Sequence, residues 1–501
     1  MRRKKLLYNT ITSFINQFIS IICGFILPRF LLSTYGSEVN GLVSSITQFL
    51  GVIAFMQLGV GAVVQSTLYE PLAKKDNEQI SKIYISSERF FRTIATIFII
   101  YTIGLVLFYP NTVNNSFDFW FTASLIIIIS FSSFSQYFFG ITNQLLLNAD
   151  QKSYITLIID TVTLIGHTIT SVMLMKCGAS IQIVKLATTL IYMLRPILMA
   201  LYVRKKYIIN KKLTILEEPI KQKWNGFAHH LASAVMDNTD VIVLTVCASL
   251  NDVSIYYVYH LVVYGIRQMI TSLTTGLQSF CGNMLAKKEM KSLKNAYSHI
   301  ELAFHILVTF LFTCTSILIV PFISVYTNGI KDVNYEVPLF AFILTFSQAI
   351  YCYRLIYFVI IKAAGHYKQT QKSALIEMGI NIVLSILLVI KYGLIGVAIG
   401  TFISTLYRMI YFIKYLSNNI IEINIKTTAY KFMVDIISIM ACYLFTRTIK
   451  LVDCSYVAWI LMAIKVAFIC GVTIIIIYYV FNFKMINQIV KRYWKKISLK
   501  S

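Results

Sequence analysis

Long apolar runs separated by short polar segments recur along the whole chain. Runs such as IATIFIIYTIGLVLFY at 94–109 and CGVTIIIIYYVF at 470–481 lie within apolar segments of about 20 or more residues, the length at which a helix crosses a bilayer. The pattern therefore predicts an all-α polytopic membrane protein with about fourteen transmembrane helices. Their predicted ranges are 10–32, 41–67, 86–109, 117–147, 153–175, 181–203, 224–247, 253–283, 299–326, 336–361, 370–390, 394–416, 427–446 and 456–482.

One charged phrase occurs twice, each time after a predicted membrane span. LAKKD at 72–76 is echoed by LAKKE at 285–289, and Tyr84 matches Tyr297 at the same offset. Identities that continue in one register indicate an internal duplication. The duplicated unit contains six predicted helices, so the two copies keep one orientation and are related by an axis along the membrane normal. The predicted organisation is an N-terminal lobe at 1–208, a basic cytoplasmic linker at 209–223, a C-terminal lobe at 224–416, and two further helices with a basic cytoplasmic tail at 417–501.

Composition and charge fit a protein embedded in a bilayer. Hydrophobic residues make up 57% of the chain and charged residues 13%, with a mean hydropathy of +0.71, which excludes an ordinary soluble domain. The net charge of +24 reads as membrane orientation and attraction to anionic lipids, so nucleic-acid binding is not needed to explain it. With both termini cytoplasmic, most Lys and Arg outside the predicted helices fall on the cytoplasmic side, and the opposite side holds Lys176, Lys331, Lys391, Arg447 and Lys450.

The sequence contains no pattern typical of a catalytic or metal centre. Its nine cysteines are scattered without a CxxC motif, and there is no Walker A sequence or glycine-rich phosphate loop. We therefore expect no catalytic residues, no metal, no cofactor and no transport driven by ATP hydrolysis within this chain.

Charged residues inside the predicted spans are the main candidates for function, because such residues are costly in hydrocarbon and face a cavity or a partner. In a helical hairpin, residues equidistant from the loop lie at similar depth, and three predicted hairpins place opposite charges level. These pairs are compatible with structural salt bridges or with cavity-lining residues. They are Asp160 with Arg195, Arg354 with Glu377, and Asp435 with Lys465.

The predicted helix at 224–247 carries a polar stripe. At 100° per residue His230, Asp237 and Asp240 share one face of the helix, which is unsuited to lipid. The stripe is either a hydrogen-bonded seam between helices or the wall of an aqueous cavity, in which it would bind a coupling ion, H⁺ or Na⁺.

Several stretches resemble bacterial polysaccharide flippases. They are FILPRFLLSTYGSEVNGLVSSITQFL, LRPILMALYVRKKY, DNTDVIVLTVCASLNDVSIYYVYHLV, KAAGHYKQTQKS and GLIGVAIGTFISTLYRMIYF. These flippases are the O-antigen and capsule repeat-unit transporters of the multidrug/oligosaccharidyl-lipid/polysaccharide exporter superfamily. The resemblance covers essentially the whole chain. It implies two six-helix bundles around a central cavity, two extra helices, and alternating access that moves a polyprenyl-pyrophosphate-linked oligosaccharide across the bacterial cytoplasmic membrane.

The chemistry of such a substrate points to arginines. A pyrophosphate in a site of reduced dielectric needs cations, and a guanidinium group binds it through two parallel hydrogen bonds. Candidate partners beyond the lipid-linked glycan are anionic membrane lipids, a polysaccharide polymerase and glycosyltransferases. The candidate substrate-binding residues are Arg29, Arg195, Arg267 and Arg354.

Two alternatives remain open at this stage. A cation-coupled multidrug antiporter of the same superfamily would have a less cationic cavity dominated by a carboxylate such as Asp237 or Asp240. A membrane protein that assists assembly without transporting anything would need neither feature.

Overall fold

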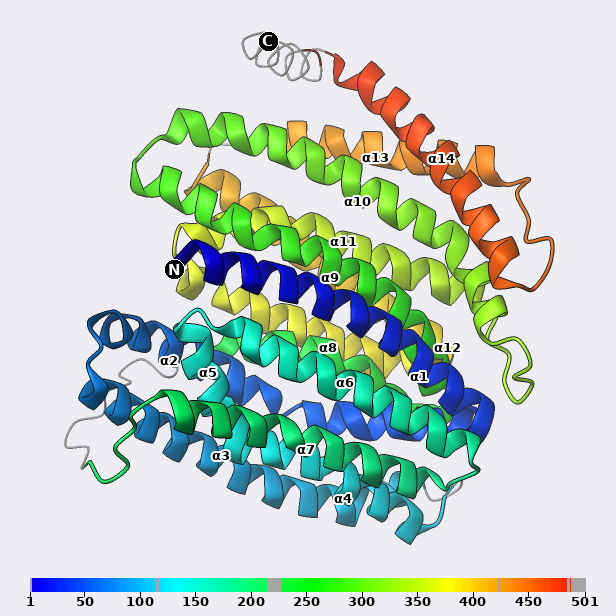
Figure 1. The fold of residues 1–501 in the computed structure, drawn as a ribbon. Coiled ribbons are helices and arrows are strands. Elements are labelled where there is room, and N and C mark those ends of the chain that lie inside the picture. The colour runs from blue at the N-terminus through cyan, green and yellow to red at the C-terminus, as the bar shows by residue number, and fades with distance from the viewer. Residues whose placement is uncertain (1, 114–116, 214–226, 422–423, 484–486, 488–501) are drawn as a thin grey trace. The chain divides into compact units, whose positions relative to one another are not determined.

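Helices dominate the structure. The computed structural model describes residues 2–113, 117–213, 227–421, 424–483 and 487, and Figure 1 shows helices throughout this part of the chain. Ten helices within the described residues are long and apolar enough to cross a membrane. The prediction of an all-α polytopic membrane protein is therefore confirmed, and each of the fourteen predicted ranges overlaps a helix of the structure.

The chain divides into two compact units. Unit 1 comprises Met1–Val258 with Gly329–Val333, and unit 2 comprises Tyr259–Asn328 with Asn334–Ser501. The lobe boundaries proposed from the repeat stay a prediction. The helices that begin in unit 1 are α1 (Arg2–Gly51), α2 (Ala54–Lys74), α3 (Asn77–Thr112), α4 (Phe119–Ser135), the π-helix η1 (Gln136–Gly140), α5 (Ile141–Ala149), α6 (Ser153–Lys176), α7 (Ile181–Lys206), α8 (Phe227–Cys247) and α9 (Leu250–Ala286). Those of unit 2 are α10 (Met290–Tyr326), α11 (Pro338–Ala363), α12 (Tyr367–Asn419), α13 (Ile425–Thr446) and α14 (Tyr456–Phe481), together with most of α9.

Two long helices each join two predicted spans at a single glycine. α1 passes through Gly36, with φ at 82°, and α12 passes through Gly393, with φ at 52°. Glycine reaches these left-handed values without the steric cost of a Cβ. The chain therefore reverses direction at these points without an intervening loop.

The second half of α1 packs closely on α8 and the start of α9 within unit 1. Asn40 Nδ2 donates to Ser254 Oγ at 2.8 Å. A Cβ on Gly41 would lie only 1.9 Å from the backbone oxygen of Leu250. A glycine is therefore required at position 41 for the backbones to approach this closely.

The duplicated phrase has a matching backbone conformation in its two copies. Lys75 follows α2 and Lys288 follows α9, and both have φ at 58°, a value that is uncommon for residues other than glycine. Tyr84 on α3 and Tyr297 on α10 are both buried. The second lysine of the repeated phrase thus has the same φ in both copies, and the matching tyrosines are both buried.

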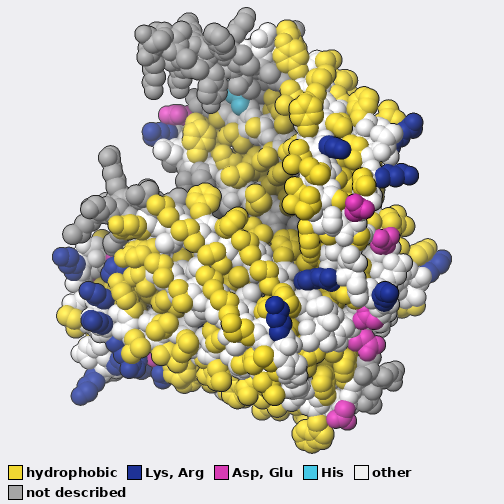
Figure 2. Space-filling model, turned by 45° about the vertical axis from the view of Figure 1, so that its right-hand side comes forward, with side chains coloured by type: hydrophobic (Ala, Val, Ile, Leu, Met, Phe, Trp, Pro, Cys, Tyr) yellow, Lys and Arg dark blue, Asp and Glu magenta, His cyan; other side chains and the backbone are white. Residues whose placement is uncertain are grey.

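The surface of the molecule matches a lipid environment. Figure 2 shows a face on which hydrophobic side chains predominate and most charged side chains lie toward the edges. Large apolar side chains such as Ile390 and Phe468 are 77% and 71% exposed, which would be costly in water and is expected next to lipid. The chain is thus a multi-pass membrane protein, and a small number of its charged side chains lie inside it.

Candidate functional site

The first internal charged site lies in unit 1, between α6 and α7. Arg195 Nε is 3.6 Å from Asp160 Oδ1 and donates a hydrogen bond of 2.6 Å to Thr163 Oγ1. Its guanidinium also lies 4.1 Å from the ring centroid of Tyr192, one turn earlier on α7. These contacts hold the guanidinium in one place, and the level pairing of Asp160 with Arg195 is confirmed.

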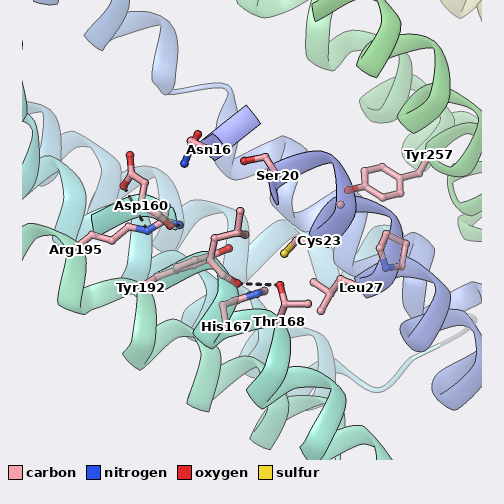
Figure 3. A pocket seen from close by; sticks show the side chains of 13 residues that line it. Asn16, Ser20, Cys23, Leu27, Asp160, His167, Thr168, Tyr192, Arg195 and Tyr257 are labelled. Carbon is pink, nitrogen blue, oxygen red and sulfur yellow. Dashed lines mark hydrogen bonds and ion pairs between the residues drawn. The ribbon is translucent and has the colours of Figure 1, made fainter. Parts of the chain in front are cut away.

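This pair lines two cavities. The larger one, of about 410 Å³, lies between α1 and the two helices α6 and α7. The smaller one, of about 320 Å³, extends toward α4, η1 and α5. Both volumes fall in the range of small-molecule sites. Figure 3 shows the larger cavity with Asn16, Ser20 and Cys23 of α1 near Asp160, His167, Tyr192 and Arg195.

The second site lies in unit 2 and contains three arginines and one glutamate. Glu377 on α12 forms ion pairs with Arg354 on α11 and with Arg408, which lies farther along α12, the latter at 3.0 Å. The guanidinium carbon of Arg267 on α9 lies 4.0 Å from the ring centroid of Tyr351, and that of Arg354 lies 4.2 Å from the same centroid. We call these three arginines with Glu377 and Tyr351 the basic cluster. Two guanidinium groups pair with one carboxylate and the third lies over the Tyr351 ring, and the level pairing of Arg354 with Glu377 is confirmed.

Glycines in α12 bring its two halves together at the basic cluster. After the reversal at Gly393, a Cβ on Gly396 would lie 2.3 Å from the backbone oxygen of Leu388, and one on Gly400 would lie 2.6 Å from Ser385 Oγ. The missing side chains let the two halves pack closely. This close packing positions Arg408, which is only 4% exposed, within reach of Glu377.

The other predicted site residues lie apart from these contacts. Arg29 is half-buried on α1, next to Pro28, which lines the larger cavity. On α8, Asp240 is buried and accepts a hydrogen bond of 2.9 Å from Tyr256, whereas Asp237 is exposed. The side chain of His230 lies outside the described part of the structure. The ion-coupling role of this stripe stays a prediction.

The predicted pairing of Asp435 with Lys465 is wrong. Lys465 on α14 is exposed. Asp435 on α13 instead bonds His305 Nδ1 at 2.6 Å on α10, with Thr309 and Tyr478 as further donors. Equal depth does not fix the direction in which a side chain points, and the face of α13 that carries Asp435 packs on α10.

Some buried charges were missed by the sequence analysis. Arg408 was not singled out, although the rule that intramembrane charges are functional candidates applies to it as well. Glu301 on α10 is paired with Lys431 on α13, and both are almost fully buried. Among the described residues, no group of three or more His, Cys, Asp or Glu is placed to hold a metal ion.

The fold of this chain is that of membrane transporters of the MOP superfamily. A structure of the lipid II flippase MurJ in an inward closed conformation matches with a TM-score of 0.70 and 18% identity, over 95% of this chain and 99% of that chain. An inward-facing multidrug resistance MATE family transporter matches with a TM-score of 0.59 and 12% identity, over 79% and 94% of the two chains. A MOP superfamily transporter from Pyrococcus furiosus matches with a TM-score of 0.55 and 12% identity, over 82% and 94%. No protein-family model and no curated protein matches the sequence.

Proposed function

We propose that this chain is a flippase. It moves a polyprenyl-pyrophosphate-linked oligosaccharide from the inner to the outer leaflet of the bacterial cytoplasmic membrane by alternating access, for surface polysaccharide biosynthesis. The observation that carries the proposal is the basic cluster, in which Arg354 and Arg408 pair with Glu377 and Arg267 lies over the same Tyr351 ring as Arg354. The similarity of the fold to that of the lipid II flippase supports it.

The basic cluster suits a pyrophosphate. Arg267 is 8% exposed and Arg408 is 4% exposed, so their charges are only weakly screened by water. Arg267 NH1 donates to Gln348 Oε1 at 3.3 Å. A phosphate group would accept paired hydrogen bonds from these planar guanidinium groups.

A wet internal route suits the sugar. Each hydroxyl group that enters hydrocarbon without a hydrogen bond costs about 2–7 kcal/mol, so a glycan needs polar walls while its polyprenyl chain stays in lipid. In unit 1, Arg29 and Arg195 are the candidate substrate-binding residues. His230, Asp237 and Asp240 remain the candidates for coupling to H⁺ or Na⁺. We further propose that both termini are cytoplasmic, that basic segments attract anionic lipids, and that a polymerase and glycosyltransferases act on the same substrate.

The experiment is a flipping assay in proteoliposomes that contain the full-length chain and a lipid-linked oligosaccharide. We expect Arg267→Ala to reduce flipping by at least about tenfold, because one charge-assisted hydrogen bond contributes about 1.5–3 kcal/mol. Arg267→Lys should restore only part of the rate, because an ammonium group keeps the charge and loses the fork of donors. Arg89, an exposed arginine on α3, provides the matched control, and Arg89→Ala should flip normally.

Multidrug antiport is the second candidate function, and the MATE folds among the similar structures favour it. The same proteoliposomes distinguish the two functions when they are loaded with a cationic dye. Dye export that survives Arg267→Ala, together with no movement of the lipid-linked oligosaccharide by the wild-type chain, would replace the flippase proposal with the antiporter.

A further inference from the structure

The smaller cavity of unit 1 has the chemistry of a site for a neutral polar ligand. Its polar side chains come from α4, η1, α5, α6 and α7. The charged ones are Asp160 and Arg195, which neutralise each other at 3.6 Å. The remaining polar lining is hydroxyl and amide: Ser132, Ser133, Gln136, Tyr137, Gln144 and Tyr192.

Such a lining fits neither an anion nor a cation well. A pyrophosphate would find one guanidinium that is already paired with a carboxylate, and a cationic drug would find the same carboxylate already paired. A sugar residue presents hydroxyl groups that both donate and accept, and it matches walls that do both. Gln136 Nε2 donates to Gln144 Oε1 at 3.0 Å. By type, this amide pair retains an acceptor oxygen on Gln136 and further N–H donors on both side chains.

The backbone is specialised at this cavity. Gln136 begins η1, the π-helix that interrupts the long helical segment from α4 to α5, and π-helical turns of this kind occur frequently at functional sites. The side chain of Gln136 folds over Gly140, where a Cβ would lie 2.4 Å from Gln136 Oε1 and 2.7 Å from its Cδ. Glycine at position 140 is therefore what allows Gln136 to lie where it does.

We propose that this cavity is a sugar subsite, in which an uncharged sugar residue of the substrate binds between Gln136 and the Asp160–Arg195 pair. The proposal rests on the proposed function and divides recognition in two. The basic cluster of unit 2 is the candidate site for the pyrophosphate, which every lipid-linked substrate carries, and the sugar subsite of unit 1 reads the glycan and contributes to specificity, each within its own unit. Gln136 contacts the ligand, and Gly140 acts by positioning Gln136.

The test measures binding of four lipids to the full-length chain in nanodiscs, by native mass spectrometry. The probes are undecaprenyl pyrophosphate alone and the same lipid linked to glucose, galactose or N-acetylglucosamine. We expect Gln136→Ala and Gly140→Ala each to weaken binding of at least one sugar-bearing lipid about tenfold, the loss of one or two hydrogen bonds. Binding of the bare lipid should not change. Arg267→Ala should weaken binding of all four lipids alike.

Gly166→Ala on α6 is the matched control, since a Cβ there would meet Ile191 at an ordinary contact distance of 3.7 Å. It should bind every lipid as the wild-type chain does. The sugar subsite is wrong if the Gln136 and Gly140 variants bind all sugar-bearing lipids as tightly as the wild type, or if they lose the bare lipid equally. In either case the flippase proposal stands. If the wild-type chain binds none of the four lipids, the flippase proposal fails, and the sugar subsite fails with it.

Discussion

Glu377 is the acidic centre of the basic cluster, and its neutralisation gives the sharpest test of the electrostatic reasoning. The carboxylate is 3% exposed and pairs with both Arg354 and Arg408. Glu377→Gln keeps the volume and one acceptor oxygen but removes the carboxylate that pairs with Arg354 and Arg408. Removal of one partner from a buried ion pair costs about 3–5 kcal/mol. We expect the lower end, about 3 kcal/mol, because the amide still accepts a hydrogen bond.

A double substitution separates charge from packing. Arg408→Met alone leaves the Arg354–Glu377 pair intact, and we expect it to cost about 1 kcal/mol. In the double variant, Glu377→Gln with Arg408→Met, one of the two buried cations that pair with Glu377 is removed together with the carboxylate, so the double variant should be more stable than Glu377→Gln alone. The coupling between the two sites should be about 2 kcal/mol.

The assay measures thermal unfolding of the purified chain in detergent, with size-exclusion chromatography as the readout of the fraction that remains folded. The expected order of melting temperature is wild type, Arg408→Met, the double variant, then Glu377→Gln. Glu70→Gln is the control, because Glu70 forms an exposed pair with Lys74 at 2.6 Å and such pairs contribute little. The reasoning would be refuted if Glu377→Gln melted at the same temperature as the wild type, or if the double variant melted at a lower temperature than Glu377→Gln.

Two further substitutions test the packing of unit 1. Gly41→Ala should lower the melting temperature strongly or prevent folding, because its Cβ would lie 1.9 Å from the backbone oxygen of Leu250. Gly104→Ala is the control and should be tolerated, because a Cβ at position 104 would have nothing within 4 Å. Equal stability of the two variants would contradict the close approach at Gly41. Arg195→Ala should destabilise the chain more than the joint replacement of Asp160 and Arg195 by alanine, because a lone buried charge is worse than none; the same melting assay checks this, and a less stable double variant would count against it.

The length and depth of the spans could be predicted from the sequence. Apolar runs bounded by polar residues marked every membrane helix. Equal distance from a hairpin loop identified the pairs Asp160 with Arg195 and Arg354 with Glu377. Both predictions depend only on the depth of a residue in the membrane, and that depth follows from its position along the sequence. The first turns of α3 were missed because its polar start was interpreted as loop. The side chain of Asp76 accepts hydrogen bonds from the backbone N–H groups of Glu78 and Gln79 and begins the helix there.

The direction of each side chain could not be predicted. Lys465 has the right depth to meet Asp435 but lies on an exposed face of α14. Arg408 reaches Glu377 only because glycines let the halves of α12 pack closely. The cavity beside Gln136 depends on a π-helix, and no periodicity in the apolar pattern marks that change of helical geometry. These features depend on rotation about the helix axes and on local backbone geometry, which are settled only when the helices pack.

The pairing of Glu301 on α10 with Lys431 on α13 has a consequence for the order of synthesis. The two residues are 130 positions apart, so at about 5–20 residues per second the ribosome makes Lys431 roughly 7 to 26 seconds after Glu301. During that interval the carboxylate has entered the membrane without its ammonium partner. Unit 2 therefore reaches its final packing only after α13 has been inserted, and a nascent chain that ends before α13 should be recognised and degraded by membrane quality control.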